Sequence, residues 1–275
     1  MKCFRKPGLT ALAILFTVTG LGLAQTAMAT PQYKFGIVPQ SSGSKLAQLW
    51  TPILDYLREK SGLDLEFATT RNIPTFEKRL EENKYDFAYM NPYQYTEMHN
   101  KSGYNAFAKA KDKRLQGIIV VEKNSQYRDL KDLAGQELAF PANAFAATLV
   151  PIAYFKSLGI SITPRYVASH DTVYRNVAKG RYPAGGGVMR TFNNTNKAVH
   201  DNLRILWTSG EYTSHAFAAS PRVPADVVAR LQQAMLNMDK DPQGQALLKS
   251  LRLKGIENGQ DNDWNDVRKL NIEEN

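Results

Sequence analysis

The hydrophobic positions of this 275-residue chain alternate between short apolar runs and longer stretches with helical spacing. The run 34–39 is typical of a short buried strand, and 44–60 carries leucine, isoleucine and tryptophan three or four residues apart. A strand at 64–70, a helix at 75–82 and a strand at 85–90 continue the alternation. Repeated strand-helix units predict an α/β fold with a parallel sheet.

A second series of the same kind follows the predicted helix at 92–100. We expect its strands at 137–140, 165–168 and 184–188 and its helices at 144–158 and 172–179. Extended runs connect the two series, at 106–110, 117–122, 203–209 and 216–220. Helices at 224–238 and 242–251 close the pattern, and Trp264 is expected to anchor the C-terminal segment.

Two series of strands and helices predict two lobes. We expect lobe 1 to contain residues 30–112 and 213–275, and lobe 2 to contain 113–212. Two crossing strands would join the lobes, and the strand ends of both would face a common ligand cleft. This arrangement is typical of binding proteins that close by a hinge motion.

The first residues have the features of a secretory leader. A basic start is followed by an apolar stretch at 9–23 and by the small-x-small site Ala27-Met28-Ala29, so a signal peptide over 1–29 is predicted. The apolar stretch is too short for a membrane span. The one cysteine, Cys3, leaves with the leader, so no disulfide is expected. We expect an exported, soluble and monomeric mature protein.

The net charge of +9 is carried by basic residues that are scattered among acidic ones. Such a mixed surface does not favour nucleic acid or a membrane as partner. A modest positive field would still attract small anions.

A tyrosine-rich run ends the strand at 85–90 and leads into an Asn-Pro helix start. In an open α/β sheet, ligands bind at this edge. The phenol and amide groups of Tyr89, Asn91 and Tyr93 are therefore candidate ligand contacts, with Asn91 also a candidate helix cap. The alternative is that these tyrosines only cover a core.

Several segments resemble the exported substrate-binding components of phosphate, phosphite and phosphonate ABC transporters. Their order and spacing carry the resemblance, which covers nearly the whole mature chain: 35–39 with 50–53, 86–89 followed by Asn91-Pro92, 130–135, 149–151 and 169–171. The resemblance implies a two-lobed periplasmic binding fold of type 2, a periplasmic location and delivery of ligand to an ABC permease. It also implies that Tyr89 contacts the ligand.

The chain departs from this family where the ligand chemistry lies. Phosphonate-binding relatives carry a Ser-Thr-Ser type tract at the start of the lobe 2 helix, whereas 143–148 here reads Asn-Ala-Phe-Ala-Ala-Thr. Asn143, Thr148 and the backbone amides of a helix start remain as candidate contacts. Acidic family positions are replaced by glycines at 185–187 and by His215, which disfavours an aminoalkyl phosphonate. The glycines are expected to let a ligand approach the backbone closely or to leave room for a bulkier one.

Four basic side chains are further candidates. Arg71 follows the strand at 64–70, and Arg190 follows the glycine strand, so either guanidinium could hold an oxyanion through two hydrogen bonds. His170 begins a helix that Asp171 could cap, and His215 lies in a crossing strand. The alternatives are surface arginines, a structural histidine at a helix start and a histidine that bonds only within the hinge.

Neither a metal site, a cofactor site nor a catalytic site is expected. The histidines have no zinc-ligand spacing, and the glycine run lacks the spacing of a dinucleotide fingerprint. Residues 169–171 read Ser-His-Asp, but adjacent residues point apart and cannot form a relay. The sequence therefore favours a receptor that captures a small anion for transport. The alternative is a periplasmic subunit that reports ligand binding to a membrane histidine kinase or cyclase.

Overall fold

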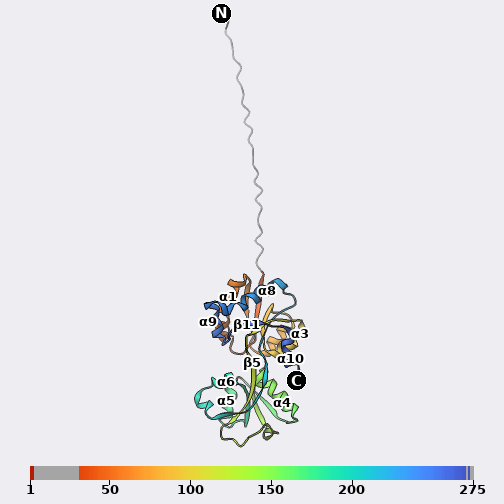
Figure 1. Ribbon diagram of the computed structural model, residues 1–275, viewed down its shortest axis with the longest axis vertical. Helices are drawn as coiled ribbons and strands as arrows, with labels where there is room; N and C mark the ends of the chain where they lie inside the picture. The colour runs from red at the N-terminus through yellow and green to blue at the C-terminus, as the bar shows by residue number, and fades with distance from the viewer. Residues whose placement is uncertain (3–30, 271, 273–275) are drawn as a thin grey trace. The chain divides into compact units, whose positions relative to one another are not determined.

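The computed structural model describes residues 1–2, 31–270 and 272. The chain divides into Met1–Thr30 and Pro31–Asn275, and the helices and strands of the described residues belong to the second unit (Figure 1). The predicted signal peptide at 1–29 therefore lies almost wholly outside the described residues. Among the described residues, none of the helices combines the length and the apolar composition needed to cross a bilayer.

The first sheet has six strands and is mixed. Its parallel part is β1 with β2 on one side and β3 on the other, while β10 runs antiparallel between β3 and β4. In spatial order the strands are β11 (Ile256–Asn258), β4 (Asn105–Ala110), β10 (Ala216–Ala219), β3 (Phe87–Met90), β1 (Gln32–Ile37) and β2 (Asp64–Ala68). The predicted parallel arrangement is correct for the N-terminal strands, and β11 was not predicted.

The second sheet has five strands, all from the middle of the chain. Here β6 is parallel to β7 and β8, whereas β5 is antiparallel to both β8 and β9. The spatial order is β7 (Thr163–Val167), β6 (Glu137–Pro141), β8 (Ala184–Val188), β5 (Arg114–Glu122) and β9 (Leu203–Thr213). Both connecting strands are longer than the sequence pattern indicated, because β5 begins at Arg114 and β9 continues to Thr213.

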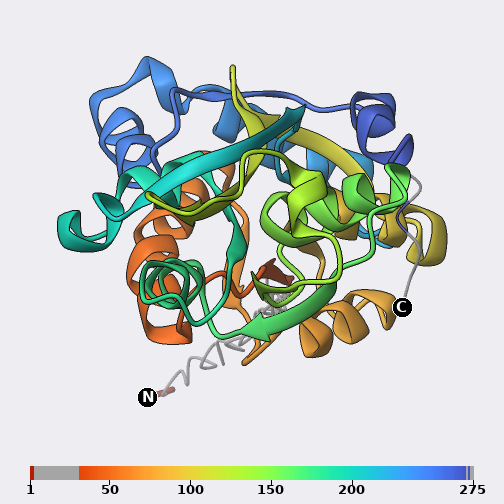
Figure 2. The ribbon, with the colours of Figure 1, turned by 90° about the horizontal axis from the view of Figure 1, so that it is seen from below.

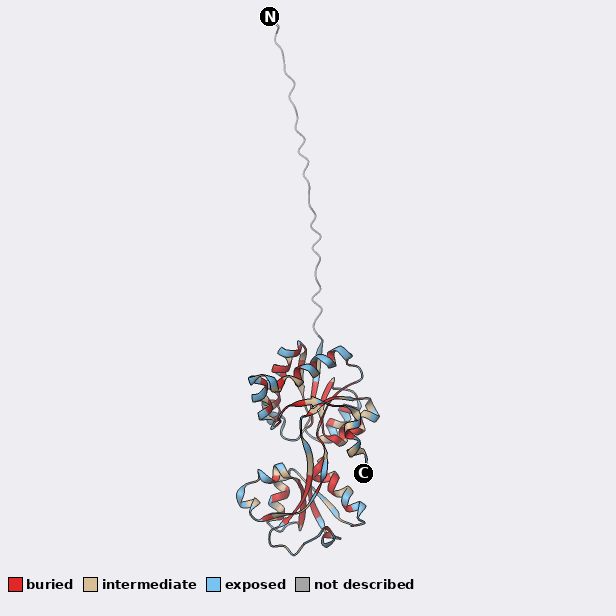
Figure 3. Ribbon diagram, viewed as in Figure 1, coloured by how far each residue is buried: buried red, intermediate tan, exposed pale blue. Residues whose placement is uncertain are grey.

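Helices cover both faces of each sheet (Figure 2), and the apolar residues between the layers are buried (Figure 3). One face of the first sheet packs against α1 (Gly43–Ser61), α8 (Ala225–Leu236) and α9 (Pro242–Ser250). Its other face packs against α2 (Ile73–Glu81), α3 (Pro92–Ser102) and α10 (Asn265–Arg268). The second sheet is covered by α4 (Val150–Ser157) on one face and by α5 (His170–Ala178), α6 (Met189–Asn193) and α7 (Lys197–His200) on the other.

Irregular helical turns complete the structure. A π-helix, Phe145–Leu149, precedes α4, and 3-10 turns occupy Leu130–Leu133, Met238–Lys240 and Asp261–Trp264. The single helix predicted for 144–158 is thus a π-turn followed by a shorter α-helix. Such π-turns occur frequently at functional sites.

The chain passes between the two sheets at two crossings. The first crossing, 111–113, joins β4 to β5, and the second, 214–215, joins β9 to β10. Antiparallel pairing of Arg114 with Thr213 brings the two crossings side by side. A loop or strand that connects two sheets in this way is where a hinge rotation would occur.

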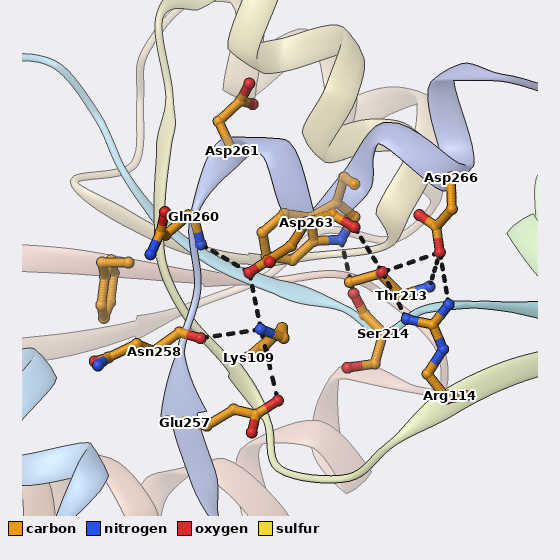
Figure 4. Close-up of polar contacts among 12 residues, drawn as sticks. Lys109, Arg114, Thr213, Ser214, Glu257, Asn258, Gln260, Asp261, Asp263 and Asp266 are labelled. Atoms are coloured by element: carbon orange, nitrogen blue, oxygen red, sulfur yellow. Dashed lines mark hydrogen bonds and ion pairs between the residues drawn. The ribbon is translucent and has the colours of Figure 1, made fainter.

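A segment near the C-terminus, residues 261–268, contacts the second crossing and the residues that flank the first, and we call it the clasp (Figure 4). Trp264 is fully buried and donates its indole N–H to the Ser214 carbonyl at 2.9 Å, which confirms its expected anchoring role. Asp263 accepts a hydrogen bond from Lys109 at 2.8 Å, at the end of β4. The clasp therefore ties the C-terminal segment to the residues that flank the crossings.

Candidate functional site

Tyr89 lies in β3 with its ring against three aromatic side chains. The ring centroids of Tyr89 and His215 are 4.9 Å apart with the planes nearly parallel, and Phe217 and Trp50 lie at 4.7 and 5.0 Å. Burial raises the pKa of Tyr89 to about 12. Its hydroxyl therefore stays protonated and can donate a hydrogen bond at neutral pH.

Asn91 and Tyr93 occupy the start of α3, as their sequence positions indicated. Asn91 is buried and caps the helix. Its side chain accepts the Gln94 backbone N–H at 2.9 Å, and the Gln94 side chain accepts the Asn91 backbone N–H at 3.1 Å. The predicted capping role of Asn91 is confirmed. The half-buried Tyr93 packs against the apolar cluster beneath α3.

His215 lies in the second crossing and is held from two sides. Its Nε2 lies 2.6 Å from the side-chain nitrogen of Gln40, and its ring stacks on Tyr89. Burial lowers the pKa of His215 to about 3, and the positive charges of Lys113 and Arg190 contribute to this shift. The uncharged imidazole can accept the Gln40 N–H at Nε2, which leaves Nδ1–H as a donor.

Lys113 ends the first crossing and is half-buried. Burial lowers its pKa to about 8, and Arg190 adds to the effect. Within the described part of the chain, no carboxylate oxygen lies within salt-bridge distance of its Nζ. A partly buried cation without a carboxylate partner is costly unless something else compensates it.

His170 is the first residue of α5. Asp171 is not the cap that the sequence suggested, because Ser169 takes that position and accepts the Thr172 N–H. Burial lowers the pKa of His170 to about 4, with a contribution from Arg190, while Asp171 opposes both. His170 is therefore a second uncharged imidazole.

Arg190 is the second residue of α6, which follows β8 directly, and hydrogen bonds to α5 fix this turn. The Tyr174 hydroxyl accepts the Val188 N–H at 3.2 Å and bonds with the Thr191 hydroxyl at 2.7 Å. Tyr174 lies one helical turn after His170, so α5 places the His170 ring and the start of α6 in the same region.

Arg190 acts electrostatically on groups from both sheets. The charge of Arg190 influences the pKa values of four residues, for each of which burial is the main influence. These residues are Tyr89, Lys113, His170 and His215. We call these four residues and Arg190 the junction cluster. It combines two cations, two uncharged imidazoles and a phenol, which is a set of donors suited to an anion.

Two members of this environment, Lys113 and Gln40, were missed in the sequence. Lys113 lies next to the predicted lobe boundary at 112, and that boundary was the only feature of the sequence that could have indicated a role for it. Gln40 follows β1 in a Pro-Gln-Ser-Ser turn with no distinguishing pattern. Its position is defined by the contact with His215, 175 residues later.

Asn143 and Thr148 flank the π-turn of the second sheet. Asn143 has a left-handed backbone with φ of 50°. Thr148 is fully buried, and its hydroxyl donates to the Pro141 carbonyl, so it fixes the loop around Asn143. No side chain caps the π-turn, so its first backbone amides depend on other partners.

The expectation that glycines at 185–187 leave room for a ligand is wrong. A Cβ on Gly186 would lie 2.0 Å from the Ala147 carbonyl oxygen, and one on Gly187 would lie 2.2 Å from the Tyr174 hydroxyl. On β5, a Cβ on Gly117 would lie 2.0 Å from the Ala146 carbonyl oxygen. The protein itself fills this space, because the π-turn rests directly on two glycine-bearing strands.

Arg71 is not joined to the junction cluster by any hydrogen bond, ion pair or ring contact in the described residues. It is exposed in the turn between β2 and α2, at the same sheet edge as Tyr89 but two strands away. Arg71 therefore occupies the outer part of this edge.

Two surface hollows lie elsewhere on the protein. One, of about 260 Å³, lies between α4, β9 and residues 269–270. The other, of about 520 Å³, lies between α1, α8 and the 3-10 turn Met238–Lys240. Neither is lined by a member of the junction cluster. The convergence of charged and polar groups, rather than cavity size, distinguishes the candidate site.

The sequence of the chain matches a family model over residues 35–264, described as ABC transporter, phosphonate, periplasmic substrate-binding protein. The chain belongs to this family. The resemblance inferred from the sequence segments is confirmed. This phosphonate-family binding protein is thus part of a group of transport receptors.

Solved structures support the same fold. A binding-protein component of a phosphonate ABC transporter from Pseudomonas aeruginosa is 15% identical, with a TM-score of 0.76 over 88% of this chain and 86% of that one. PhnD1 from Prochlorococcus marinus, in complex with methylphosphonate, is 16% identical, with a TM-score of 0.76 over 86% and 96%. A chloride-bound protein from Xanthomonas citri is 17% identical, with a TM-score of 0.77 over 86% and 95%. The predicted α/β fold of the type 2 periplasmic binding proteins is confirmed for this phosphonate-family binding protein.

Proposed function

We propose that this protein captures a small oxyanion of the phosphonate or phosphate type at the junction cluster and presents it to an ABC permease. One observation carries the proposal. Lys113 and Arg190 come from different parts of the fold, both act on the His215 imidazole, and have no carboxylate ion-pair partner in the described residues. An anionic ligand would supply the missing charge.

Each member of the cluster has a role in this proposal. Arg190 would hold two oxygens of the anion through parallel hydrogen bonds. Tyr89 would donate its hydroxyl, and the uncharged His170 and His215 would each donate one ring N–H. Lys113 would contribute charge from the first crossing.

The remaining candidates would act around this centre. Asn143 and the amides of the π-turn would approach the anion from the second sheet. Arg71 would lie at the outer edge and attract the ligand. Asn91, Tyr93 and Thr148 would hold the backbone on which the contacting groups stand.

We propose that binding couples to hinge closure of two lobes, 30–112 with 213–275 and 113–212. The crossings at 111–113 and 214–215 would serve as the hinge. Closure would bring the π-turn and Arg190 onto a ligand that rests against Tyr89. Removing water from the cluster would strengthen each charged hydrogen bond.

The proposal involves binding without turnover. Ser169, which is followed by His170 and Asp171, uses its hydroxyl to cap α5 and lies 3.0 Å from the Thr172 hydroxyl. It is therefore a structural serine and not a nucleophile activated by a histidine. We propose that the protein has no hydrolase activity.

The cellular setting follows from the family. We propose a monomer released into the periplasm after removal of residues 1–29, with an ABC permease as its membrane partner. A membrane sensor kinase or cyclase remains the alternative partner. Co-purification with the permease from membranes, increased by ligand, would support transport, whereas ligand-dependent co-purification with a sensor would support the alternative.

A direct test uses purified residues 30–275 in a thermal-shift screen followed by calorimetry. The screen would include methylphosphonate, phosphate, phosphite, alkyl sulfonates and small carboxylates. A phosphorus oxyanion should raise the melting temperature because it binds only the folded state. Arg190→Ala should abolish the shift, whereas Arg181→Ala, an exposed arginine beyond the opposite end of α5 from His170, should retain it. No shift with any oxyanion would contradict the proposal.

A further inference from the structure

The basic residues around the first crossing are paired with carboxylates, with one exception. Lys109 contacts Asp263 at 2.8 Å, and Lys111 contacts Asp239 at 3.5 Å. Immediately after the crossing, Arg114 contacts Asp266 at 2.8 Å, as Figure 4 shows for Lys109 and Arg114. In the described residues, Lys113 is the member of this series that lacks such a partner.

The position of Lys113 explains the difference. Its neighbour Arg114 pairs with Thr213, so Lys113 lies beside the second crossing, next to Ser214 and close to His215. The lysine is half-buried there, whereas Lys111 is exposed. Lys113 thus directs its charge toward the junction cluster, and the paired residues direct theirs toward the C-terminal half of the chain.

The junction cluster as a whole has an excess of positive charge. Lys113 and Arg190 are its two cations, and both imidazoles are uncharged. Among the described residues, the carboxylate that acts on the cluster is Asp171, which is exposed at the start of α5 and influences His170. In the part of the chain that the structure describes, the exposed Asp171 is outweighed by the two cations, so a positive charge on a ligand would be repelled.

We propose that Lys113 and Arg190 act as a pair of specificity-determining cations that select a doubly negative oxyanion whose remaining part is uncharged or acidic. This inference rests on the proposed function, because it names the substrate class of the same site. Alkyl phosphonates, phosphate and phosphonocarboxylates belong to the class. Aminoalkyl phosphonates do not, since their ammonium group would face two cations that outweigh the exposed Asp171.

The substituent of the ligand provides the test. Ethylphosphonate, phosphonoacetate and aminoethylphosphonate have similar size and differ in the charge of the substituent. Calorimetry on residues 30–275 at neutral pH should show that aminoethylphosphonate binds at least about tenfold more weakly than ethylphosphonate, because like charges are brought together. Phosphonoacetate should bind at least as tightly as ethylphosphonate.

Variants of Lys113 identify the source of this preference. Lys113→Gln should reduce the difference between ethylphosphonate and aminoethylphosphonate, and Lys113→Glu should reverse the order of the two ligands. Lys111→Gln is the matched control. It removes the same charge from a lysine two residues away, whose side chain is paired with Asp239. It should leave the ratio of affinities unchanged. Melting temperatures without ligand would show that each variant folds, and Lys113→Met replaces Lys113→Glu if the latter does not.

The outcomes separate the two proposals. If phosphate and all three phosphonates fail to bind, the proposed function itself is wrong. If they bind, but wild-type protein has equal affinity for ethylphosphonate and aminoethylphosphonate, the site is an oxyanion receptor and the selection by charge is refuted. The role of Lys113 would likewise be refuted if the ratio of affinities for ethylphosphonate and aminoethylphosphonate were the same in wild type, in Lys113→Gln and in the folded Lys113→Glu or Lys113→Met variant.

Discussion

The carboxylate of Asp266 accepts a hydrogen bond from the guanidinium of Arg114 at 2.8 Å. The same oxygen accepts the Thr213 backbone N–H at 2.8 Å and lies 3.0 Å from the Thr213 hydroxyl. Arg114 follows the first crossing, and Thr213 precedes the second. One side chain in the clasp therefore holds both connections between the sheets, so the clasp would affect both folding stability and hinge motion.

Removal of this carboxylate should destabilise the protein. Asp266→Ala leaves the partly buried Thr213 N–H and the Arg114 guanidinium without their shared acceptor, and we expect a loss of about 1–3 kcal/mol in the free energy of unfolding. Urea denaturation of residues 30–275 measures this change. Asp55→Ala is the control, because Asp55 and Arg58 form an ion pair on the exposed surface of α1. It should cost less than about 1 kcal/mol. Equal effects of the two substitutions would contradict the role of the clasp.

The Tyr89 hydroxyl should contribute to ligand binding without being required for folding. Tyr89→Phe retains the ring that packs against His215 and Phe217 and removes one donor to the anion. Affinity for the best oxyanion should fall by about 1.5–3 kcal/mol, the usual contribution of a hydrogen bond to a charged group. Calorimetry tests this, with Tyr33→Phe in β1 as a control that should bind normally. Unchanged affinity in Tyr89→Phe would mean that the ligand lies elsewhere.

The two half-buried histidines, His170 and His215, should make the folded state sensitive to acid. Burial lowers the pKa of His170 to about 4 and that of His215 to about 3, from the ordinary histidine value of 6.5. Below pH 6.5 the unfolded chain therefore binds protons that the folded chain excludes, so stability falls as the pH decreases from 6.5 toward 4. At higher pH this effect is absent.

Urea denaturation at several pH values in this range would measure the slope. His170→Gln and His215→Gln should each make it smaller, because glutamine does not titrate. His200→Gln, outside the junction cluster, should not reduce it. If His170→Gln and His215→Gln both kept the wild-type slope of stability against pH, other groups would cause the acid sensitivity.

The close contact between β8 and the π-turn should not tolerate a methyl group. In Gly186→Ala the new Cβ would lie 2.0 Å from the Ala147 carbonyl oxygen, so the turn or the strand must shift. We expect a loss of about 1–3 kcal/mol in the free energy of unfolding. Gly210→Ala in β9 is the control, since no atom lies within 4 Å of the added Cβ. Similar stability of the two variants would show that the π-turn moves freely.

The order of helices and strands could be predicted because it depends on local periodicity. The pattern at 44–60 gave α1 nearly to the residue, and the strand at 184–188 coincides with β8. Local chemistry also predicted that Asn91 caps α3. The same reasoning failed for Asp171, because Ser169 one residue before His170 is an equally good cap and is the one used.

The charge distribution of the site could not be predicted, because it depends on long-range pairing. Lys109, Lys111, Lys113 and Arg114 look alike in the sequence. Only the tertiary contacts distinguish Lys113, since the partners of the other three lie more than a hundred residues away. The glycines at 185–187 show the same limit. Their sequence indicates open space, while the contacts that fill it come from α5 and the π-turn.

The bond between Arg114 and Asp266 spans 152 residues. A ribosome makes the first crossing long before it makes the clasp, so Lys109 and Arg114 lack their acidic partners while the intervening strands and helices are synthesised. Contacts of such large sequence separation form late on a folding pathway. Loss of Asp266 should therefore accelerate unfolding more than it slows folding. A receptor assembled in this order would complete its moving joint only after the two bodies it connects have taken shape.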